Sequence, residues 1–319
     1  MNEAFACPVC ADDDWETHGR RHYRGGERTH TQGRVLSDYE LLRRRVLFEV
    51  WCPGRNEVTL TERMCRQCGF MAYAPRPTSA DVAAKYRFLQ HWEDDIGGSA
   101  PSARGMELDR RRADRAHRAI VSDLGREPRR VLDFGGGNGK LLAPFLKQGA
   151  DCALVDYNVR PLPGVRKLAD TLHDLPDIEP FDAIVCSHVL EHLADPLTTL
   201  QSLYPLLAAD GVLYSEVPVE IWIGLPIGAD PVTHINFFTP HSLTRLHTRA
   251  GLRAITVRQF AGNYAAYRMQ VATVTARRDD TRTADDRSAG DAGEAHRLLR
   301  PSVLDRLAHA FRQRRLAGG

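Results

Sequence analysis

One apolar run of the chain contains an acid and leads into a turn rich in glycine. The run is Val131-Leu132-Asp133-Phe134, and the alternating glycines after it are Gly135, Gly137 and Gly139. Without a Cβ, glycine allows a tight turn and a close approach of the backbone to a ligand. Amides at the start of a following helix suit an anionic group. The dinucleotide fingerprint G-x-G-x-x-G would need a glycine at position 140, which is lysine, so that fingerprint is not met.

A second acid, Asp156, follows the apolar run Cys152–Val155 and should end the next strand. In nucleotide-binding sheets, a carboxylate at this place accepts hydrogen bonds from both ribose hydroxyls. A solvated loop aspartate is the alternative, and the position after the glycine turn favours the ligand role. Cys152 and Cys186 lie inside strand patterns, so we interpret both as small core residues.

Two C-x-x-C pairs have the spacing of metal knuckles. They are Cys7, Cys10, Cys65 and Cys68. Each pair directs two thiolates at one centre, and four thiolates complete a tetrahedral zinc site with no open position, so the metal would be structural. The long separation between the pairs is tolerable because loop-closure entropy grows slowly with length. Cys52, before a turn signal, is the rival ligand, and unrelated free thiols are the other alternative.

Three histidines and a glutamate could carry out proton transfer or bind a metal. His188, Glu191 and His192 are spaced i, i+3 and i+4, as on one face of a helical turn. With His234 they would offer four ligands to a divalent metal, but the simpler interpretation is that they line a cleft without one. His234 alone is a candidate general base, since imidazole has a pKa near neutrality. A structural histidine in a turn is the alternative. Asn236 beside it could orient a hydroxyl.

These side chains need a scaffold, and the hydrophobic pattern predicts strands that alternate with helices. A helix with Ala113, Ala116, Ile120 and Leu124 on one face should precede the first strand. Pro144 should distort the helix after the glycine turn. Further strands are predicted at 181–187 and 211–217, helices at 196–207 and around 243–250, and a closing antiparallel pair at 255–260 and 267–275. This alternation predicts a parallel sheet with ligands at the carboxyl ends of its strands.

The composition limits the classes of protein that remain. The chain has 319 residues, 43% of them hydrophobic, and a net charge of +2, so it can form one α/β domain plus a small module. Near-neutral charge gives no global signal for nucleic acid or membrane. Without a membrane-length apolar run or a secretory signal, a cytoplasmic location is expected. The expected domains are a zinc-ribbon-like module with an insertion (1–78), an α/β domain (79–277), and a flexible linker with a basic helix (278–319).

Two motifs in the α/β region resemble those of one enzyme family. The glycine frame with its preceding acid resembles motif I of the class I S-adenosylmethionine-dependent methyltransferases. The stretch FDAIVCSHVLEHL (181–193) is similar to the motif after strand four in a branch that includes ubiquinone-pathway O-methyltransferases and sugar methyltransferases. The resemblance implies a Rossmann-like, seven-stranded sheet that binds S-adenosylmethionine. The cofactor-binding residues that it implies are Asp133 at the ammonium group, Asp170 in the region that contacts adenine, and Gly135, Gly137, Gly139, Asp156 and Ser187.

The junction CRQCGFMAYAPRPTSADVAAKY resembles that of zinc-ribbon methyltransferases acting on nucleotide-linked deoxysugars and related small molecules. In those enzymes the N-terminal module lies over the catalytic cleft and contributes aromatic groups. Tyr86 is the candidate here, with a packing tyrosine as the alternative. In the sugar C-methyltransferases a glutamate precedes the histidine that matches His234. Thr233 replaces that glutamate, so we expect the acidic partner to be lost and a carbon-centred mechanism to be disfavoured.

The sequence therefore predicts a methyltransferase with a structural zinc that acts on a small hydroxylated acceptor, such as a nucleotide-linked sugar or a biosynthetic intermediate. O- and C-methylation both remain open. The alternative enzyme is an RNA methyltransferase that uses the zinc module and Arg-rich segments such as Arg43-Arg44-Arg45 to hold phosphates. The near-zero net charge argues against a nucleic-acid partner. A non-catalytic binding protein with the same fold is the third alternative. No membrane partner and no oligomeric state are indicated.

Overall fold

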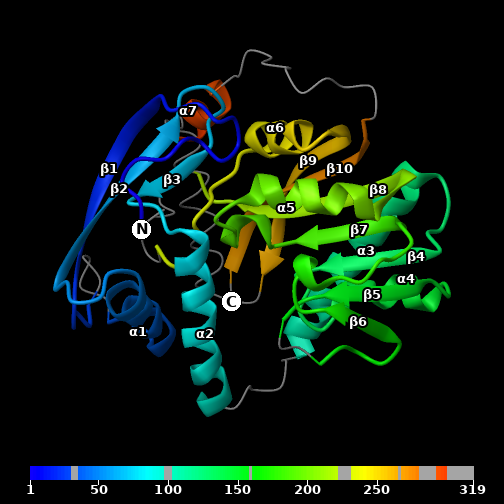
Figure 1. The fold of residues 1–319 in the computed structure, drawn as a ribbon, viewed down its shortest axis with the longest axis horizontal. Helices are drawn as coiled ribbons and strands as arrows, with labels where there is room; N and C mark the ends of the chain where they lie inside the picture. The colour runs from blue at the N-terminus through cyan, green and yellow to red at the C-terminus, as the bar shows by residue number, and fades with distance from the viewer. Residues whose placement is uncertain are drawn as a thin grey trace.

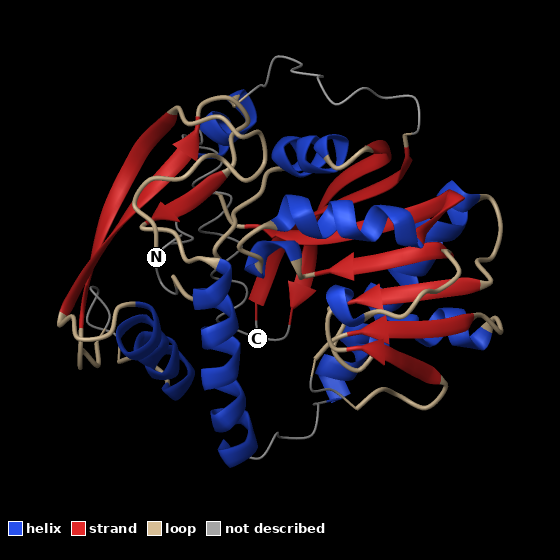
Figure 2. Ribbon diagram, viewed as in Figure 1, coloured by secondary structure: helices blue, strands red, loops and turns tan. Residues whose placement is uncertain are grey.

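The computed structural model describes residues 1–29, 35–96, 103–157, 160–221, 231–264, 267–279 and 292–299. Two β-sheets organise these residues: a three-stranded sheet near the N-terminus and a seven-stranded sheet formed by the rest of the chain (Figures 1 and 2). Within the described ranges, no helix combines the length and the apolar character needed to cross a membrane.

The seven-stranded sheet has the order β6-β5-β4-β7-β8-β10-β9. Five strands pair in parallel: β4 (Arg130–Phe134), β5 (Asp151–Val155), β6 (Val165–Ala169), β7 (Phe181–Ser187) and β8 (Leu207–Val219). β10 (Tyr267–Arg278) runs antiparallel to both β8 and β9 (Leu252–Tyr264). The strand order reverses at β4, and such a reversal opens a ligand crevice at the carboxyl ends of the strands. This is the seven-stranded, Rossmann-like sheet that the sequence predicts.

Helices cover both faces of the large sheet (Figure 1). α3 (Ala103–Leu124) and α4 (Ala143–Lys147) lie on one face, and α5 (Pro196–Leu203) and α6 (Pro240–Arg249) lie on the other. Side chains alternate between the faces along each strand, so Val131 packs in the α3 cluster and Leu132 in the α5 and α6 cluster. Pro144 divides the predicted helix as expected: a 3₁₀ turn (Lys140–Leu142) precedes α4, and the proline occupies the first turn of α4.

The small sheet is antiparallel and consists of β1 (Trp15–Arg24), β2 (Glu57–Cys65) and β3 (Met71–Ala74). Between β1 and β2 the chain forms α1 (Asp38–Arg45), which begins with a capping box between Ser37 and Glu40 and continues as a π-helical turn (Val46–Trp51). α2 (Ser79–Ile96) follows β3, and α7 (Gly293–Leu299) packs against the small sheet near Gly69. The insertion that separates the cysteine pairs is therefore mostly strand and helix.

A backbone pairing joins the small N-terminal sheet to the part of the protein that contains the large sheet. The Met71 N–H donates to the Phe237 carbonyl, and the Phe237 N–H donates to the Met71 carbonyl, both at 3.0 Å. Met71 belongs to β3, whereas Phe237 lies in the segment between β8 and α6 that also carries His234. The small sheet thus helps to fix the position of that segment.

The local structure differs from the sequence prediction at 188–192. Instead of a helical turn, His188 has a left-handed backbone with φ of 57°, and only Leu190–His192 forms a 3₁₀ turn. The spacing i, i+3, i+4 arises there from a compact loop, so the prediction of a helix was wrong. Residues 160–164 form no helix. Within the region 278–319, predicted as a linker and a basic helix, residues 280–291 and 300–319 lie outside the described residues.

Candidate active site

The candidate residues gather along one edge of the large sheet. The glycine loop follows β4, Asp156 follows β5, Asp170 follows β6, and Ser187 ends β7. Glu220, which the sequence analysis did not select, directly follows β8. Because parallel strands end on the same side of a sheet, these five segments lie at one edge, where ligands of such sheets bind.

The glycine loop wraps closely around the Asp133 carboxylate. Gly135, Gly137 and Gly139 have φ values of 68°, 62° and 83°, the left-handed region that favours glycine. A Cβ at Gly136 would lie 1.9 Å from an Asp133 oxygen, so this neighbouring glycine, which the sequence analysis overlooked, is also required. Asp133 is fully buried, and neither carboxylate oxygen has a hydrogen-bond partner among the described residues.

The second acid is held against the same loop. Asp156 accepts a hydrogen bond from the Gly137 N–H at 2.7 Å. Burial raises the pKa of Asp156, and that N–H opposes the shift. Burial and then the charge of Asp156 raise the pKa of Asp133 to about 7. Asp170 is exposed at the end of β6 and pairs with Lys167 at 2.5 Å, and its predicted place near adenine stays a prediction.

These groups fit a ligand that has both a cationic and a hydroxylated part. The unpartnered carboxylate of Asp133 favours a donor such as an ammonium group, because an unpaired buried polar group is costly. No atom lies within 4 Å of a Cβ placed on Gly137, so the backbone is open to a ligand there. The Asp156 carboxylate keeps lone pairs for ribose hydroxyls. The residues present therefore fit S-adenosylmethionine.

Asp156→Ala should weaken binding of S-adenosylhomocysteine by about 1–3 kcal/mol, the cost of losing hydrogen bonds to a charged acceptor. Isothermal titration calorimetry measures this loss, and Asp177→Ala, at an exposed position, is the matched control. A wild-type protein that binds nicotinamide dinucleotide and ignores both S-adenosyl ligands would overturn the assignment.

A buried ion network lies below the ends of β7 and β8. Glu216, only 1% exposed, pairs with Arg112 at 3.2 Å and Arg115 at 2.8 Å, both from α3. Ser187 donates to Glu216 at 3.2 Å and accepts from Arg112 at 2.9 Å. Burial opposes ionisation of Glu216, but His188 and the two arginines hold its pKa well below the usual range. The Ser187 hydroxyl is thus bonded within the protein, and its cofactor-binding role stays a prediction.

His188 lies between two buried carboxylates. Its Nδ1 is 3.0 Å from Glu191 Oε1, and its Nε2 is 3.4 Å from Glu216 Oε1. Burial favours a neutral ring, but the two glutamates outweigh it and raise the pKa of His188 to about 9. Burial also opposes the charge of Glu191, yet this imidazolium brings the pKa of Glu191 down to about 2. The group of side chains whose ligand atoms lie within 4.8 Å of one another does not include His188, so its place in the predicted metal-ligand set stays a prediction.

The other three members of that set lie together. Ligand atoms of Glu191, His192 and His234 are all within 4.8 Å of one another. His192 Nδ1 lies 2.7 Å from the Thr233 carbonyl, which can only accept, so Nδ1 carries the proton and Nε2 keeps its lone pair. Burial lowers the pKa of His192 to about 3, so this ring is neutral. The rings of His192 and His234 meet edge to face at 4.8 Å.

His234 has an acidic partner, so the expectation that this partner is lost was wrong. Its Nδ1 lies 2.7 Å from Glu220 Oε2, a carboxylate that follows β8. Nδ1 therefore carries the proton, which leaves Nε2 as the proton acceptor. Burial lowers the pKa of His234, but Glu220 outweighs this effect and raises the pKa above its ordinary value. Glu220 thus supplies from another segment the carboxylate that Thr233 does not.

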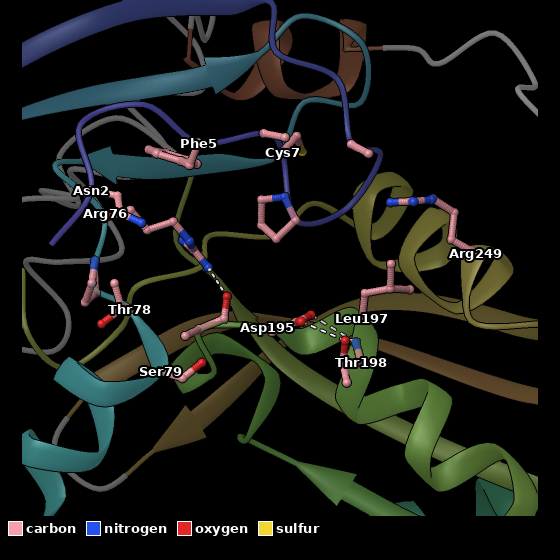
Figure 3. Close-up of a pocket in the computed structure, with 15 residues that line it drawn as sticks. Asn2, Phe5, Cys7, Arg76, Thr78, Ser79, Asp195, Leu197, Thr198 and Arg249 are labelled. Carbon is pink, nitrogen blue, oxygen red and sulfur yellow. Dashed lines mark hydrogen bonds between the residues drawn. The ribbon is translucent and has the colours of Figure 1, made fainter.

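Asn236 has a structural role, so its predicted role in orienting a hydroxyl was wrong. Its side chain is 1% exposed, donates to the Leu190 and Leu193 carbonyls at 2.6 and 2.7 Å, and accepts from Arg76 at 2.6 Å. Figure 3 shows Arg76 reaching toward the start of α5 across a pocket at the seam between the two parts of the protein. Asn236 therefore ties the 190–193 turn to the segment that carries His234.

Tyr86 extends from α2 toward the cofactor side of the crevice. Its ring meets that of Tyr157, the residue after Asp156, edge to face at 5.6 Å. The Lys85 ammonium lies 4.7 Å from the same ring and donates to the Val232 carbonyl at 3.1 Å. Burial raises the pKa of Tyr86, so the phenol stays protonated. An aromatic residue from the N-terminal part thus contacts the cofactor side, and its contact with substrate stays a prediction.

The four cysteines selected from the sequence come together. The Sγ atoms of Cys7 and Cys68 are 3.6 Å apart, those of Cys10 and Cys65 are 3.4 Å apart, and all four lie within 4.8 Å. A tetrahedral zinc with bonds of about 2.3 Å requires sulfur separations of about 3.8 Å, so the donor set fits. Cys52 packs in a different apolar cluster and is not a member.

Comparison with known proteins identifies the class of the α/β region. Residues 107–257 match a family model described as a methyltransferase domain. A ubiquinone biosynthesis O-methyltransferase of Actinobacillus pleuropneumoniae serotype 7 (strain AP76) is 36% identical over 103 residues, which are 27% of this chain and 44% of that protein. Its counterpart in Dinoroseobacter shibae (strain DSM 16493 / NCIMB 14021 / DFL 12) is 29% identical over 210 residues, 56% of this chain and 83% of that protein. In four such relatives the match spans about half the length, from 44% to 51%.

A solved structure shares the fold. The 1,6-didemethyltoxoflavin-N1-methyltransferase of Burkholderia thailandensis, with bound 1,6-didemethyltoxoflavin and S-adenosylhomocysteine, superposes with a TM-score of 0.51 at 23% identity, over 66% of this chain and 96% of that one. Residues 107–257 thus form a methyltransferase domain with the class I fold of S-adenosylmethionine-dependent methyltransferases.

Proposed function

We propose that the protein transfers a methyl group from S-adenosylmethionine to a hydroxyl of a small acceptor. The observation that carries this proposal is the His234–Glu220 pair, whose Nδ1–Oε2 distance is 2.7 Å, at the carboxyl edge of the sheet. Bound there, S-adenosylmethionine would supply an electrophilic methyl group on its sulfonium. Asp133, Asp156 and the glycine loop would hold and orient it.

His234 acts on the acceptor. Its Nε2 accepts the hydroxyl proton as the acceptor oxygen attacks the methyl carbon, and the Glu220 carboxylate stabilises the imidazolium that results. A hydroxyl needs only this one base. The names of the relatives, which are O-methyltransferases of ubiquinone biosynthesis, also support oxygen as the atom methylated.

A panel of phenols, catechols and nucleotide-linked sugars tests the proposal. Mass spectrometry should detect one added methyl group on an acceptor oxygen, together with equimolar S-adenosylhomocysteine. Methylation only at carbon or nitrogen, or preferred methylation of RNA, would replace this function with another. Binding of the cofactor without transfer to any acceptor would favour a non-catalytic role.

The rate should rise with pH through a pKa above the ordinary histidine value of about 6.5. The charged or titratable groups that face His234 are Glu220, Glu191, His188 and His192, and Glu220 raises its pKa. Below that pKa the ring is protonated and cannot accept a proton. Glu220→Gln removes the stabilising carboxylate, so the midpoint of the pH–rate profile should move to lower pH and the plateau rate should fall.

Steady-state rates across pH measure this shift. Glu179→Gln, at an exposed position, should leave the profile unchanged. A Glu220→Gln midpoint at or above the wild-type value would exclude the carboxylate as the partner of the base.

A divalent metal at Glu191, His192 and His234 is a second candidate, favoured by one observation. The Nδ1 of His192 is hydrogen-bonded to the Thr233 carbonyl, and the Nδ1 of His234 is hydrogen-bonded to Glu220. In metal-bound histidines, the ring nitrogen that does not bind the metal usually makes such a hydrogen bond. A metal there would activate the acceptor hydroxyl by lowering its pKa. Loss of turnover on chelation, restored by zinc or manganese while the cysteine site stays filled, would support this candidate over His234 as the base.

The cysteine site has a different role in the proposal. Cys7, Cys10, Cys65 and Cys68 hold a structural zinc, because four thiolates leave no coordination position for a substrate. The zinc stabilises the sheet from which β3 pairs with Phe237, so it supports the catalytic segment from a distance.

A further inference from the structure

The insertion between the cysteine pairs contacts the segment that carries His234. On α1, Tyr39 and Arg43 lie one helical turn apart, and the guanidinium stacks 4.5 Å from the Tyr39 ring and donates to its hydroxyl at 2.6 Å. That hydroxyl lies 3.4 Å from Thr233 Oγ1. Thr233 immediately precedes His234, so a single tyrosine connects Arg43 to the segment that carries the base.

Arg43 also acts on the cofactor side of the crevice. Burial raises the pKa of the Tyr86 phenol, and the charge of Arg43 opposes that shift. The Tyr86 ring in turn meets Tyr157, which follows Asp156. The guanidinium thus acts electrostatically on Tyr86 and, through Tyr39, contacts the segment with the base.

The charge of Arg43 has no acidic partner within the described part of the chain. Its Nε is buried and makes no hydrogen bond, and its Nη2 donates to the Tyr39 hydroxyl. Arg45 on the same helix differs, because it forms a bidentate pair with Glu49 at 2.6 and 2.9 Å. A guanidinium that no carboxylate neutralises can offer its fork of donors to a planar oxyanion.

We propose, on the basis of the methyl transfer proposed above, that Arg43 binds an oxyanion of the acceptor, either a carboxylate or a phosphate. The acceptor would lie with its anionic end at α1 and its hydroxyl toward His234. Tyr39 holds the guanidinium in place by stacking. The insertion then selects acidic hydroxylated substrates over neutral ones.

Three matched probes test this selection by calorimetry with saturating S-adenosylhomocysteine: 4-hydroxybenzoate, 4-hydroxyphenyl phosphate and the neutral 4-hydroxybenzamide. Wild-type protein should bind at least one anion about tenfold or more tightly than the amide, as expected for a charge-assisted hydrogen-bond pair. Arg43→Met should abolish that preference. Arg43→Lys should keep part of it, because lysine retains the charge without the fork. Which anion is preferred identifies the source of the oxyanion.

Arg45→Met is the matched control, since Arg45 is already paired with Glu49, and it should keep the full anion preference. Unchanged melting temperatures would show that the variants fold. Wild-type protein without an anion preference, or an Arg43→Met variant that retains it, overturns the proposal. Failure of the proposed function has a different signature, because the acceptor panel would then show no methylation at oxygen, whereas the anion preference is measured as binding and not as turnover.

Discussion

His234→Gln is expected to lower turnover by about 10²–10⁴-fold, the usual contribution of a general base. Glutamine can retain a hydrogen bond to Glu220 but offers no imidazole nitrogen that accepts a proton. Cofactor affinity should stay nearly unchanged, because the groups that fit the cofactor lie at the ends of β4 and β5. Initial rates with an acceptor from the panel, together with calorimetry of S-adenosylhomocysteine, separate the two effects.

His173→Gln is a matched control, because the His173 side chain is 97% exposed and lies in the loop after β6. Its rate should equal that of the wild type. Wild-type turnover in His234→Gln, with no effect of chelators, would make His234 a structural residue and exclude both the base and the metal candidate.

Cys65→Ser should prevent binding of the proposed zinc and cause a large fall in melting temperature. Structural zinc in small sites contributes on the order of 10–16 kcal/mol at neutral pH, more than the stability of a typical domain. Turnover should fall as well, because β3 would no longer hold Phe237 beside the base-bearing segment. Elemental analysis and thermal unfolding measure the two direct effects.

Cys52→Ser provides the matched control, since Cys52 is buried away from the four clustered thiols and should leave zinc content unchanged. An apo protein that melts at the wild-type temperature would leave the cluster without a structural role. Zinc that is kept in Cys65→Ser and lost in Cys52→Ser would point to a different ligand set.

The parts of the fold that were predictable are those encoded by local patterns. The apolar runs at 131–134, 152–155 and 181–187 became β4, β5 and β7, because buried parallel strands are nearly continuous hydrophobic segments. Gly135, Gly137 and Gly139 were identifiable because a left-handed turn needs glycine. The cysteine cluster followed from the paired spacing alone.

The parts that were missed depend on contacts between distant segments. Glu220 meets His234 across 14 residues of chain, and nothing in the spacing between them indicates the pairing. The sequence analysis predicted that Asn236 orients the acceptor hydroxyl because it lies close to His234 in the sequence. In the structure its side chain is hydrogen-bonded to Arg76 and to two backbone carbonyls. Local sequence does not specify which way a loop side chain points.

Some signals were present and could have been used. Glu216 is the single carboxylate in the buried stretch 211–219 of β8, and a charge there needs partners, which α3 supplies. The run of three glycines at 135–137 indicated that the middle one also lacks space for a side chain. The helical turn predicted from His188 onward was wrong because the i, i+3, i+4 spacing can occur in a loop as well as in a helix.

The pairing of Met71 with Phe237 also bears on the aggregation of the small sheet during synthesis of the chain. β3 is an edge strand of its sheet, and an open edge can recruit a strand from another molecule. The segment that covers part of this edge is synthesised only after β8. Until then the small sheet has an uncovered edge that can pair with other chains. By pairing with the edge of β3, the methyltransferase domain thus also protects the N-terminal module against aggregation.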